Sequence, residues 1–216
     1  MSRGTIVGPG PYESCIPAAG ARLSSAQQAT PRPAPGGTRS GALEDMQTTP
    51  SLTEAAPQLG RYRIDPDSSS VTFRTRHLFG LAPVRGRFAL RSGTVDVTEP
   101  LAGSRVYAEF DAASFHTGNP VRDAQVRSAG FLGAGAHPVL AFSSKGLDGQ
   151  ILAGTLTVRE VTRPVSVVTT VTGVSPGSFT ARATVRIDRY DFGVTASRGL
   201  AGRHLDVTLE VRCVRS

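Results

Sequence analysis

The chain has 216 residues, of which 39% are hydrophobic, and a formal net charge of +7, so it is long enough for one sizeable domain and a tail. The positive charge is almost entirely arginine, scattered singly with no run of five basic residues, and this pattern argues against a nucleic-acid-binding protein. No stretch approaches the roughly 18 apolar residues that a membrane-spanning helix needs.

The first 60 residues differ in composition from the rest of the chain. They are rich in Pro, Gly, Ala, Ser and Thr and show no hydrophobic period. Such a segment cannot bury enough apolar surface to offset the entropy lost on ordering its backbone. We therefore predict a disordered tail over residues 1–60 and a folded domain over residues 61–216.

The N-terminus carries no basic start followed by an apolar core, which a secretory signal would need. We therefore expect a cytoplasmic protein. Met46 opens a compact leader just ahead of the predicted domain, and our hypothesis is that Met46, not Met1, is the native start.

From Tyr62 onward the sequence alternates apolar and polar residues with a period of two, which is typical of strands with one buried face. We expect a turn at residues 65–68 and a hairpin at Ser92-Gly93. The short, turn-separated apolar runs predict about eight main strands, drawn from Val71–His77, Val84–Leu90, Thr94–Thr98, Val106–Phe110, Val139–Ser144, Ile151–Val158, Val165–Val174, Phe179–Asp188 and Arg203–Arg212.

Loops this short join antiparallel neighbours. Closure of the sheet removes exposed edges, and the sequence has no Trp of the kind that a sandwich core usually contains. We therefore predict an all-β fold, an eight-stranded antiparallel barrel, rather than a sandwich. A barrel of eight strands has room inside for one small ligand, or it can be just filled by its own side chains.

The alternation breaks between Ala112 and His137, where Asn119-Pro120 predicts the start of a short helix. We expect this segment to cap one end of the barrel. Arg122 and Asp123 lie on that helix. They form either a surface ion pair of little worth or a site where the guanidinium holds an anionic head group at the pocket mouth.

The sequence offers few catalytic or metal-binding signals. His77, His116, His137 and His204 have no spacing typical of a metal site, and no serine-hydrolase, phosphate-loop or dinucleotide motif occurs. We interpret His77 as a core histidine hydrogen-bonded to a carbonyl in preference to a ligand contact. Cys213 falls on the inward register of the last strand and is expected to be a small buried residue. No cofactor and no metal are predicted.

With these pieces in place, the sequence resembles the YceI-like family of lipocalin-like barrels that bind polyisoprenoids. The resemblance covers residues 61–216 and rests on the order and spacing of several pieces: Tyr62-x-Ile64-Asp65-Pro66, His77-Leu78, Ala113-Ser114-Phe115-x-Thr117-Gly118, Arg122-Asp123, Phe131, His137-Pro138-x-Leu140-x-Phe142-x-Ser144, Arg163-Pro164 and Arg189-x-Asp191-Phe192-Gly193. It implies a lipocalin-like barrel with a short helical cap whose interior binds an isoprenoid.

Our leading hypothesis is therefore a non-enzymatic carrier or sequestering protein for a long-chain isoprenoid or similar amphiphile. His77, Arg122 and Asp123 would orient the head group. The apolar wall of the tunnel is expected to come from inward residues, of which we single out Phe73, Phe88, Phe110, Phe131, Leu140, Phe142, Leu156, Ile187 and Phe192, with Val71, Leu90, Val106, Leu152, Val185, Leu205, Val207 and Leu209 beside them.

Two alternatives remain open. The first is an enzyme acting on a small lipophilic or quinone-like substrate, with His77 or Asp123 as general base, although no paired acid and base support it. The second is a packed barrel that serves only as an interaction scaffold, since the residues of a tunnel wall and of a packed core are the same. The sequence also leaves the oligomeric state open, a homodimer included.

Overall fold

The structure is a computed structural model that describes residues 56–78 and 80–216. Most of the predicted tail and both candidate start residues, Met1 and Met46, therefore lie outside the described residues. The described part contains eight strands, one α-helix and one short 3₁₀ helix: β1 (Gly60–His77), β2 (Ala82–Val97), η1 (Leu101–Gly103), β3 (Arg105–His116), α1 (Pro120–Arg127), β4 (Val139–Asp148), β5 (Ile151–Val158), β6 (Val161–Ser175), β7 (Ser178–Asp188) and β8 (His204–Arg215).

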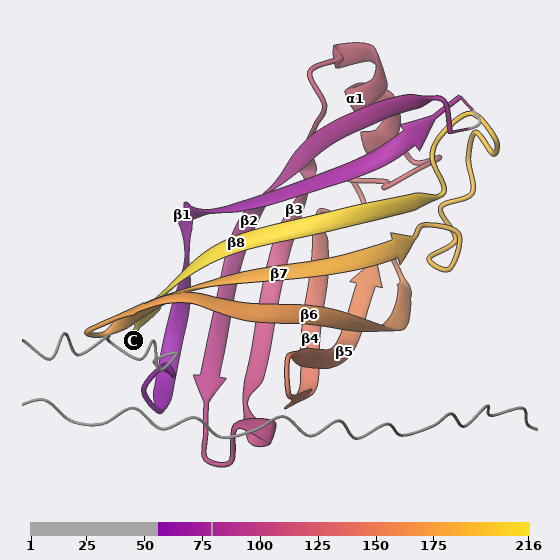
Figure 1. The fold of residues 1–216 in the computed structure, drawn as a ribbon. Helices are drawn as coiled ribbons and strands as arrows, with labels where there is room; N and C mark the ends of the chain where they lie inside the picture. Colours follow the sequence, from indigo (N-terminus) through magenta and orange to yellow (C-terminus); the bar gives the residue numbers. More distant parts are fainter. Residues whose placement is uncertain (1–55, 79) are drawn as a thin grey trace, which may run out of the picture. The chain divides into compact units, whose positions relative to one another are not determined.

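The eight strands form a closed antiparallel barrel, as the sequence predicts (Figure 1). Each strand pairs with the next one in the chain. β1 also pairs with β8 from Tyr62 opposite Arg215 to Arg74 opposite Asp206, so the sheet has no open edge. Because consecutive strands are antiparallel, alternate connections lie at opposite ends of the barrel.

Strand β8 shows how the sequence pattern becomes a barrel wall. Its apolar residues Leu205, Val207, Leu209, Val211 and Cys213 all border the barrel interior. The polar residues between them face outward. There Asp206 lies 3.9 Å from Arg186, and Glu210 lies 3.8 Å from Arg182. These exposed ion pairs contribute little to stability, so the inward face supplies the stabilising contacts of this strand.

The expected hairpin at Ser92-Gly93 is wrong. β2 runs without reversal from Ala82 to Val97, and the register with β3 shifts between Leu90 and Ser92. Glycine at 93 is needed for space, because a Cβ there would lie 2.6 Å from the Cδ1 atom of Ile64. The Ser-Gly signal therefore marks a β-bulge and a close approach between strands. Two of the nine expected short strands, Val84–Leu90 and Thr94–Thr98, belong to the single strand β2, and the barrel therefore has eight strands.

The expected turn at residues 65–68 is a bend within β1. The Asp65 carboxylate accepts hydrogen bonds from the backbone N–H of Asp67 (3.2 Å) and the hydroxyl of Ser68 (2.7 Å). The register with β8 shifts between Asp65 and Ser70, and the strand then continues to His77. The local turn chemistry forms as expected, but it bends the chain without reversing it (Figure 1).

Helix α1 lies in the β3–β4 connection and begins as predicted. The side chain of Asn119 accepts a hydrogen bond from the backbone N–H of Arg122 (3.0 Å), and Pro120 occupies the first helical turn. Helix residues Arg122, Gln125 and Val126 border the barrel interior. We call the end of the barrel that carries α1 and the β7–β8 connection the capped end, and the other the opposite end.

Candidate functional site

The barrel encloses a cavity of about 800 Å³ that all eight strands line. It extends from His77 and Leu200 at the capped end to Ser104 and Gln150 at the opposite end. This volume falls within the roughly 300–1,000 Å³ of small-molecule sites in proteins. The interior of the barrel is therefore hollow in the structure and not filled by its own side chains.

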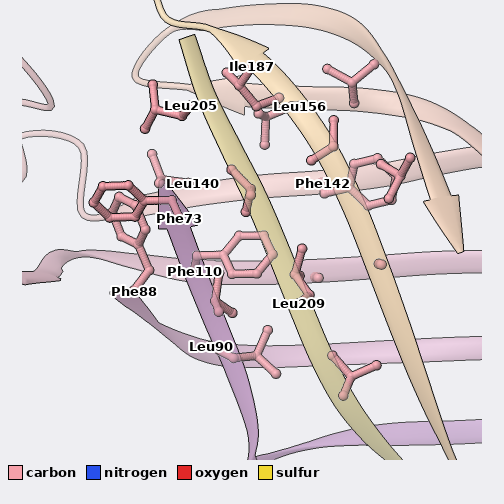
Figure 2. A pocket seen from close by; sticks show the side chains of 18 of the residues that line it. Phe73, Phe88, Leu90, Phe110, Leu140, Phe142, Leu156, Ile187, Leu205 and Leu209 are labelled. Atoms are coloured by element: carbon pink, nitrogen blue, oxygen red, sulfur yellow. The ribbon is translucent and has the colours of Figure 1, made fainter. Parts of the chain in front are cut away.

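The residues that the sequence singles out for the tunnel wall come together around this cavity. The lining includes every predicted wall residue and also His77 and Arg122, but it does not include Asp123. Figure 2 shows Phe73 of β1, Phe110 of β3, Leu140 and Phe142 of β4 and Leu209 of β8 pointing into one shared space. Their convergence on one space follows from the two-residue period of their strands.

An aromatic cluster lines the cavity toward the capped end. The ring of Phe73 lies 5.6 Å from that of Phe88 and 5.2 Å from that of Phe115, and the last two rings are 5.4 Å apart. Gly86, opposite Phe73 on β2, makes room for it, since a Cβ at this position would collide with the Phe73 ring. The cluster forms a rigid apolar surface beside the polar groups of this end.

His77 occupies the mouth of the cavity, where its side chain is half-buried. Its Nδ1 atom is hydrogen-bonded to the carbonyl oxygen of Leu200, which lies on the β7–β8 connection. A carbonyl can only accept, so Nδ1 carries the proton and Nε2 is an acceptor in the neutral ring. The structure thus shows the expected carbonyl bond, with the residue at the mouth and not in the core.

Arg122 and Asp123 do not pair with each other, because both bind Thr117. The Arg122 guanidinium donates to the Thr117 hydroxyl (2.7 Å) and carbonyl (3.3 Å). The Asp123 carboxylate accepts from the Thr117 backbone N–H (3.0 and 3.1 Å) and from its hydroxyl, and it lies 3.2 Å from Nδ1 of His116. Arg122 reaches the cavity, whereas Asp123 ties the start of α1 to the end of β3.

The charge state of Asp123 follows from these contacts. Its side chain is almost fully buried, which by itself would raise its pKa. The hydrogen bonds from Thr117, with His116 and Arg127 nearby, outweigh that effect and lower the pKa below its ordinary value of 3.8. Asp123 is therefore an ionised structural anchor, and it is not in the cavity with His77, the other residue considered as a base.

Arg189 is a cavity residue whose role sequence reasoning missed. It follows β7 directly, lines the cavity and is only 8% exposed. Its guanidinium lies 4.8 Å from the ring centroid of Tyr190 and 5.6 Å from that of Phe131. Arg189 belongs to the Arg-x-Asp-Phe-Gly motif of the sequence. A loop has no hydrophobic period, so no sequence pattern predicts that its arginine is buried.

The described residues contain no group of three or more His, Cys, Asp and Glu side chains arranged to hold a metal ion. Within the same residues, no helix has the length and apolar character required to cross a membrane.

Comparison with known proteins agrees with this architecture. The sequence profile of the YceI-like domain matches residues 62–214. A UPF0312 protein of Yersinia enterocolitica is 30% identical over 178 residues, which cover 76% of this chain and 92% of the relative. A UPF0312 protein of Shewanella baltica has the same identity and coverage.

Two solved structures share the fold. BcnA of Burkholderia cenocepacia matches with a TM-score of 0.60 at 20% identity, covering 69% of this chain and 98% of that one. A polyisoprenoid binding domain from Saccharophagus degradans, described as implicated in plant cell wall breakdown, matches with a TM-score of 0.59 at 17% identity, covering 74% of this chain and all of that one.

Proposed function

The chain belongs to the YceI-like domain family, and from that membership and its hollow barrel we propose that it binds a long-chain isoprenoid or a similar amphipathic lipid inside the barrel. Its role is to carry or sequester this ligand without transforming it. The solved relative from Saccharophagus degradans, which is described as a polyisoprenoid binding domain, supports the ligand class.

The observation that carries the proposal is the apolar cavity running along the barrel. Removing apolar surface from water gains roughly 25 cal/mol per Å², so burying roughly 300 Å² of a prenyl chain corresponds to about 7.5 kcal/mol before the costs of association. A chain of several isoprene units therefore needs no strong polar contact to bind. The polar residues His77 and Arg122 at the capped end then serve to orient its head group.

A pair of tryptophan variants tests whether the ligand lies inside the barrel. Ala183 on β7 lines the cavity, whereas its neighbour Thr184 is exposed. A shift of one residue on a strand moves the side chain to the other face. Ala183→Trp should therefore fill part of the cavity, and Thr184→Trp is the matched control on the outer face.

The measurement is a titration of each variant with geranylgeraniol, monitored by thermal shift and by native mass spectrometry. We expect a one-to-one complex with the wild-type chain and with Thr184→Trp, and at least about tenfold weaker binding by a folded Ala183→Trp. Absence of a complex and of a thermal shift with prenyl lipids would sink the proposal. Equal binding by the two variants would place the ligand outside the barrel.

The enzymatic alternative has its own readout. Lipid recovered by organic extraction after long incubation with the protein should be chemically unchanged, as judged by its mass. A product that forms only with the folded chain would favour catalysis over carriage.

A further inference from the structure

Three exposed leucines lie together at the capped end of the barrel, where the β1–β2 and β7–β8 connections are side by side (Figure 1). Leu78, Leu81 and Leu200 have exposed fractions of 49%, 82% and 48%, respectively. The backbone N–H of Leu78 donates to the carbonyl of Leu200 (2.9 Å), and that of Leu81 donates to the carbonyl of Leu78 (3.1 Å). The three residues therefore form one local surface, which we call the leucine patch.

The leucine patch borders the mouth of the cavity. Leu200 and His77 both line the cavity, and the carbonyl of Leu200 accepts the hydrogen bond from Nδ1 of His77. The β7–β8 connection is packed closely against β1 at this point, because a Cβ on Gly202 would collide with the side chain of Thr75. Any surface that covers the leucine patch therefore also faces the entrance of the cavity.

Four exposed arginines follow the leucine patch along the outer face of β1 and β2, and we call them the arginine patch: Arg74, Arg76, Arg85 and Arg87. They alternate with residues that line the cavity and therefore point away from it. Arg74 lies directly opposite Arg85 in the register of the two strands. Like charges placed directly opposite each other destabilise a sheet, so the fold itself gains nothing from this arrangement.

The charges of the arginine patch are not neutralised by neighbouring carboxylates. Within residues 56–78 and 80–216, none of the four arginines forms an ion pair. Asp206 of β8 is opposite Arg74 in register, but its carboxylate lies 3.9 Å from Arg186. The Arg76 guanidinium donates instead to the carbonyl of Gly80 (3.3 Å), within the β1–β2 connection. A cluster of unpaired arginines is the charge complement of an anionic surface.

We propose that the leucine patch and the arginine patch together dock the capped end on a membrane that contains anionic lipids. The leucines enter the boundary between head groups and acyl chains, and the arginines contact the lipid phosphates. Each arginine near such a surface strengthens binding by roughly fivefold. Arg74 precedes Leu78 by four residues, roughly 13 Å along the strand, so the barrel leans on the membrane with the β1–β2 hairpin.

Docking in this orientation sets the mouth of the cavity against the bilayer. A lipophilic ligand can then pass between the bilayer and the barrel without crossing water, where its apolar surface would be exposed at a cost. The inference goes beyond the proposed function, because docking itself requires no ligand in the cavity.

Two other uses of the same surface predict different behaviour. An acidic protein partner would be held by the arginines through charge complementarity, without transfer of the leucines into hydrocarbon. A face that serves only to keep the protein in solution would bind no vesicle. Membrane docking alone requires both the positive charges and the removal of the leucines from water.

The first test is sedimentation of the full chain with vesicles of phosphatidylcholine alone or with about 30% phosphatidylglycerol, prepared without isoprenoid. We expect binding to the anionic vesicles only, weakened at least about tenfold when the salt concentration rises from about 0.05 M to about 0.5 M. Absence of binding to anionic vesicles at low salt, or equal binding to both kinds, overturns the inference. Neither result affects the proposed function, since no cavity ligand takes part in the measurement.

Paired variants assign the binding to the arginine patch. Arg74→Gln combined with Arg85→Gln should weaken binding to anionic vesicles at least about tenfold, and the fold should tolerate it because a like-charge pair is removed. The matched control, Arg63→Gln combined with Arg212→Gln, removes the same charge from exposed positions near the opposite end. Equal weakening by the two pairs would mean that the net charge of +7 attracts the vesicles, and it would overturn the assignment.

Fluorescence tests whether the leucine patch enters the bilayer. The chain contains no tryptophan, so Leu81→Trp introduces a single fluorophore at an exposed position. Its emission should shift to the blue on anionic vesicles and be quenched by brominated lipid. Leu59→Trp, at a 49% exposed residue of the opposite end, is the matched control and should show neither change.

A charged substitution at the same position completes the test. Leu81→Asp should weaken binding to anionic vesicles at least about tenfold, because a carboxylate is repelled from the surface that the leucine enters. Full binding by Leu81→Asp, or an unshifted emission of vesicle-bound Leu81→Trp, would indicate contact through charge alone. That result would suit an acidic protein and would overturn the membrane as the partner.

Discussion

The connections at the two ends of the barrel differ in the number of charged residues that they carry. The connections of the capped end carry most of the loop charges, namely Arg122, Asp123, Arg127, Arg159, Glu160, Arg189, Asp191, Arg198 and Arg203, whereas the β2–β3, β4–β5 and β6–β7 connections at the opposite end carry only Glu99. At the opposite end, buried apolar residues pack with few charges beside them, whereas at the capped end a buried apolar cluster that includes Phe115, Phe131 and Phe192 lies beside the charged residues. Tyr62, Phe179 and Cys213 belong to one buried cluster at the opposite end, with the rings of Tyr62 and Phe179 4.9 Å apart.

This contrast separates the apolar packing, which supports the fold at both ends, from the charged residues of the capped end, which are suited to select a ligand. Apolar packing is non-directional and stabilises the barrel without distinguishing one head group from another. Buried charges and hydrogen bonds contribute less net stability but impose geometry and a charge preference. We therefore expect substitutions of apolar residues at the opposite end to affect stability alone, and substitutions of charged residues at the capped end to affect pH dependence and ligand choice as well.

The largest expected effect is on stability at the opposite end. Phe179→Ala removes a buried ring from the Tyr62 cluster and should lower the free energy of unfolding by about 3–5 kcal/mol. Urea denaturation followed by circular dichroism measures this loss. The matched control is Val121→Ala, because Val121 is an 80% exposed residue of α1 at the capped end and should change stability by about 0.5 kcal/mol or less. A similar loss for both variants would show that the burial of the Phe179 ring is not what stabilises the fold at this position.

The next effect concerns Asp123 at the capped end. Asp123→Asn weakens charge-assisted bonds to Thr117 and should cost about 1–3 kcal/mol at pH 7. Because the folded-state pKa of Asp123 lies below 3.8, its ionised form stabilises the fold above that value, and this stability is lost as the pH falls through the folded pKa.

The difference in unfolding free energy between wild type and Asp123→Asn should therefore be complete above about pH 5 and should shrink below the ordinary pKa of 3.8. Urea titrations at a series of pH values measure it. Asp191→Asn, at an exposed carboxylate of the same end, is the control and should change stability by about 0.5 kcal/mol or less at pH 7. A cost for Asp123→Asn that stays constant down to pH 2 would show that its charge is irrelevant.

The smallest expected effect concerns the reactivity of the Cys213 thiol toward an alkylating reagent. Burial raises the pKa of the Cys213 thiol to about 12, so only about one molecule in 10,000 carries the reactive thiolate at pH 8. Iodoacetamide should leave Cys213 unlabelled in the native protein and label it after unfolding in urea, as read by peptide mass spectrometry. Rapid labelling under native conditions would mean that water reaches the opposite end of the cavity.

The barrel could be predicted from the sequence because its wall follows a period of two, and a residue such as Leu209 needs no partner to be placed on the inner face. The bulge at Gly93 could not be predicted, since the space that Ile64 requires depends on a strand far away in the sequence. The capped end shows the same limit. Asp123 binds Thr117 and Arg189 binds three carbonyls of the following loop, and both arrangements depend on loop conformations that have no period.

The cavity could be predicted from the sequence only in part. The sequence predicts many of its apolar lining residues, but whether they leave space or fill it depends on how side chains from opposite strands meet. Phe73 and Phe142 fit against glycines at 86 and 154, which lets the rings lie close to the wall. Such pairings decide the inner volume, and they are visible only once the register between strands is known.

A crystal structure of the protein grown with geranylgeraniol tests the central claim most directly. We predict continuous elongated electron density inside the barrel, in contact with Phe110, Leu140 and Leu209. An interior filled by the protein's own side chains, with the lipid absent or bound to the outer surface, would contradict the account.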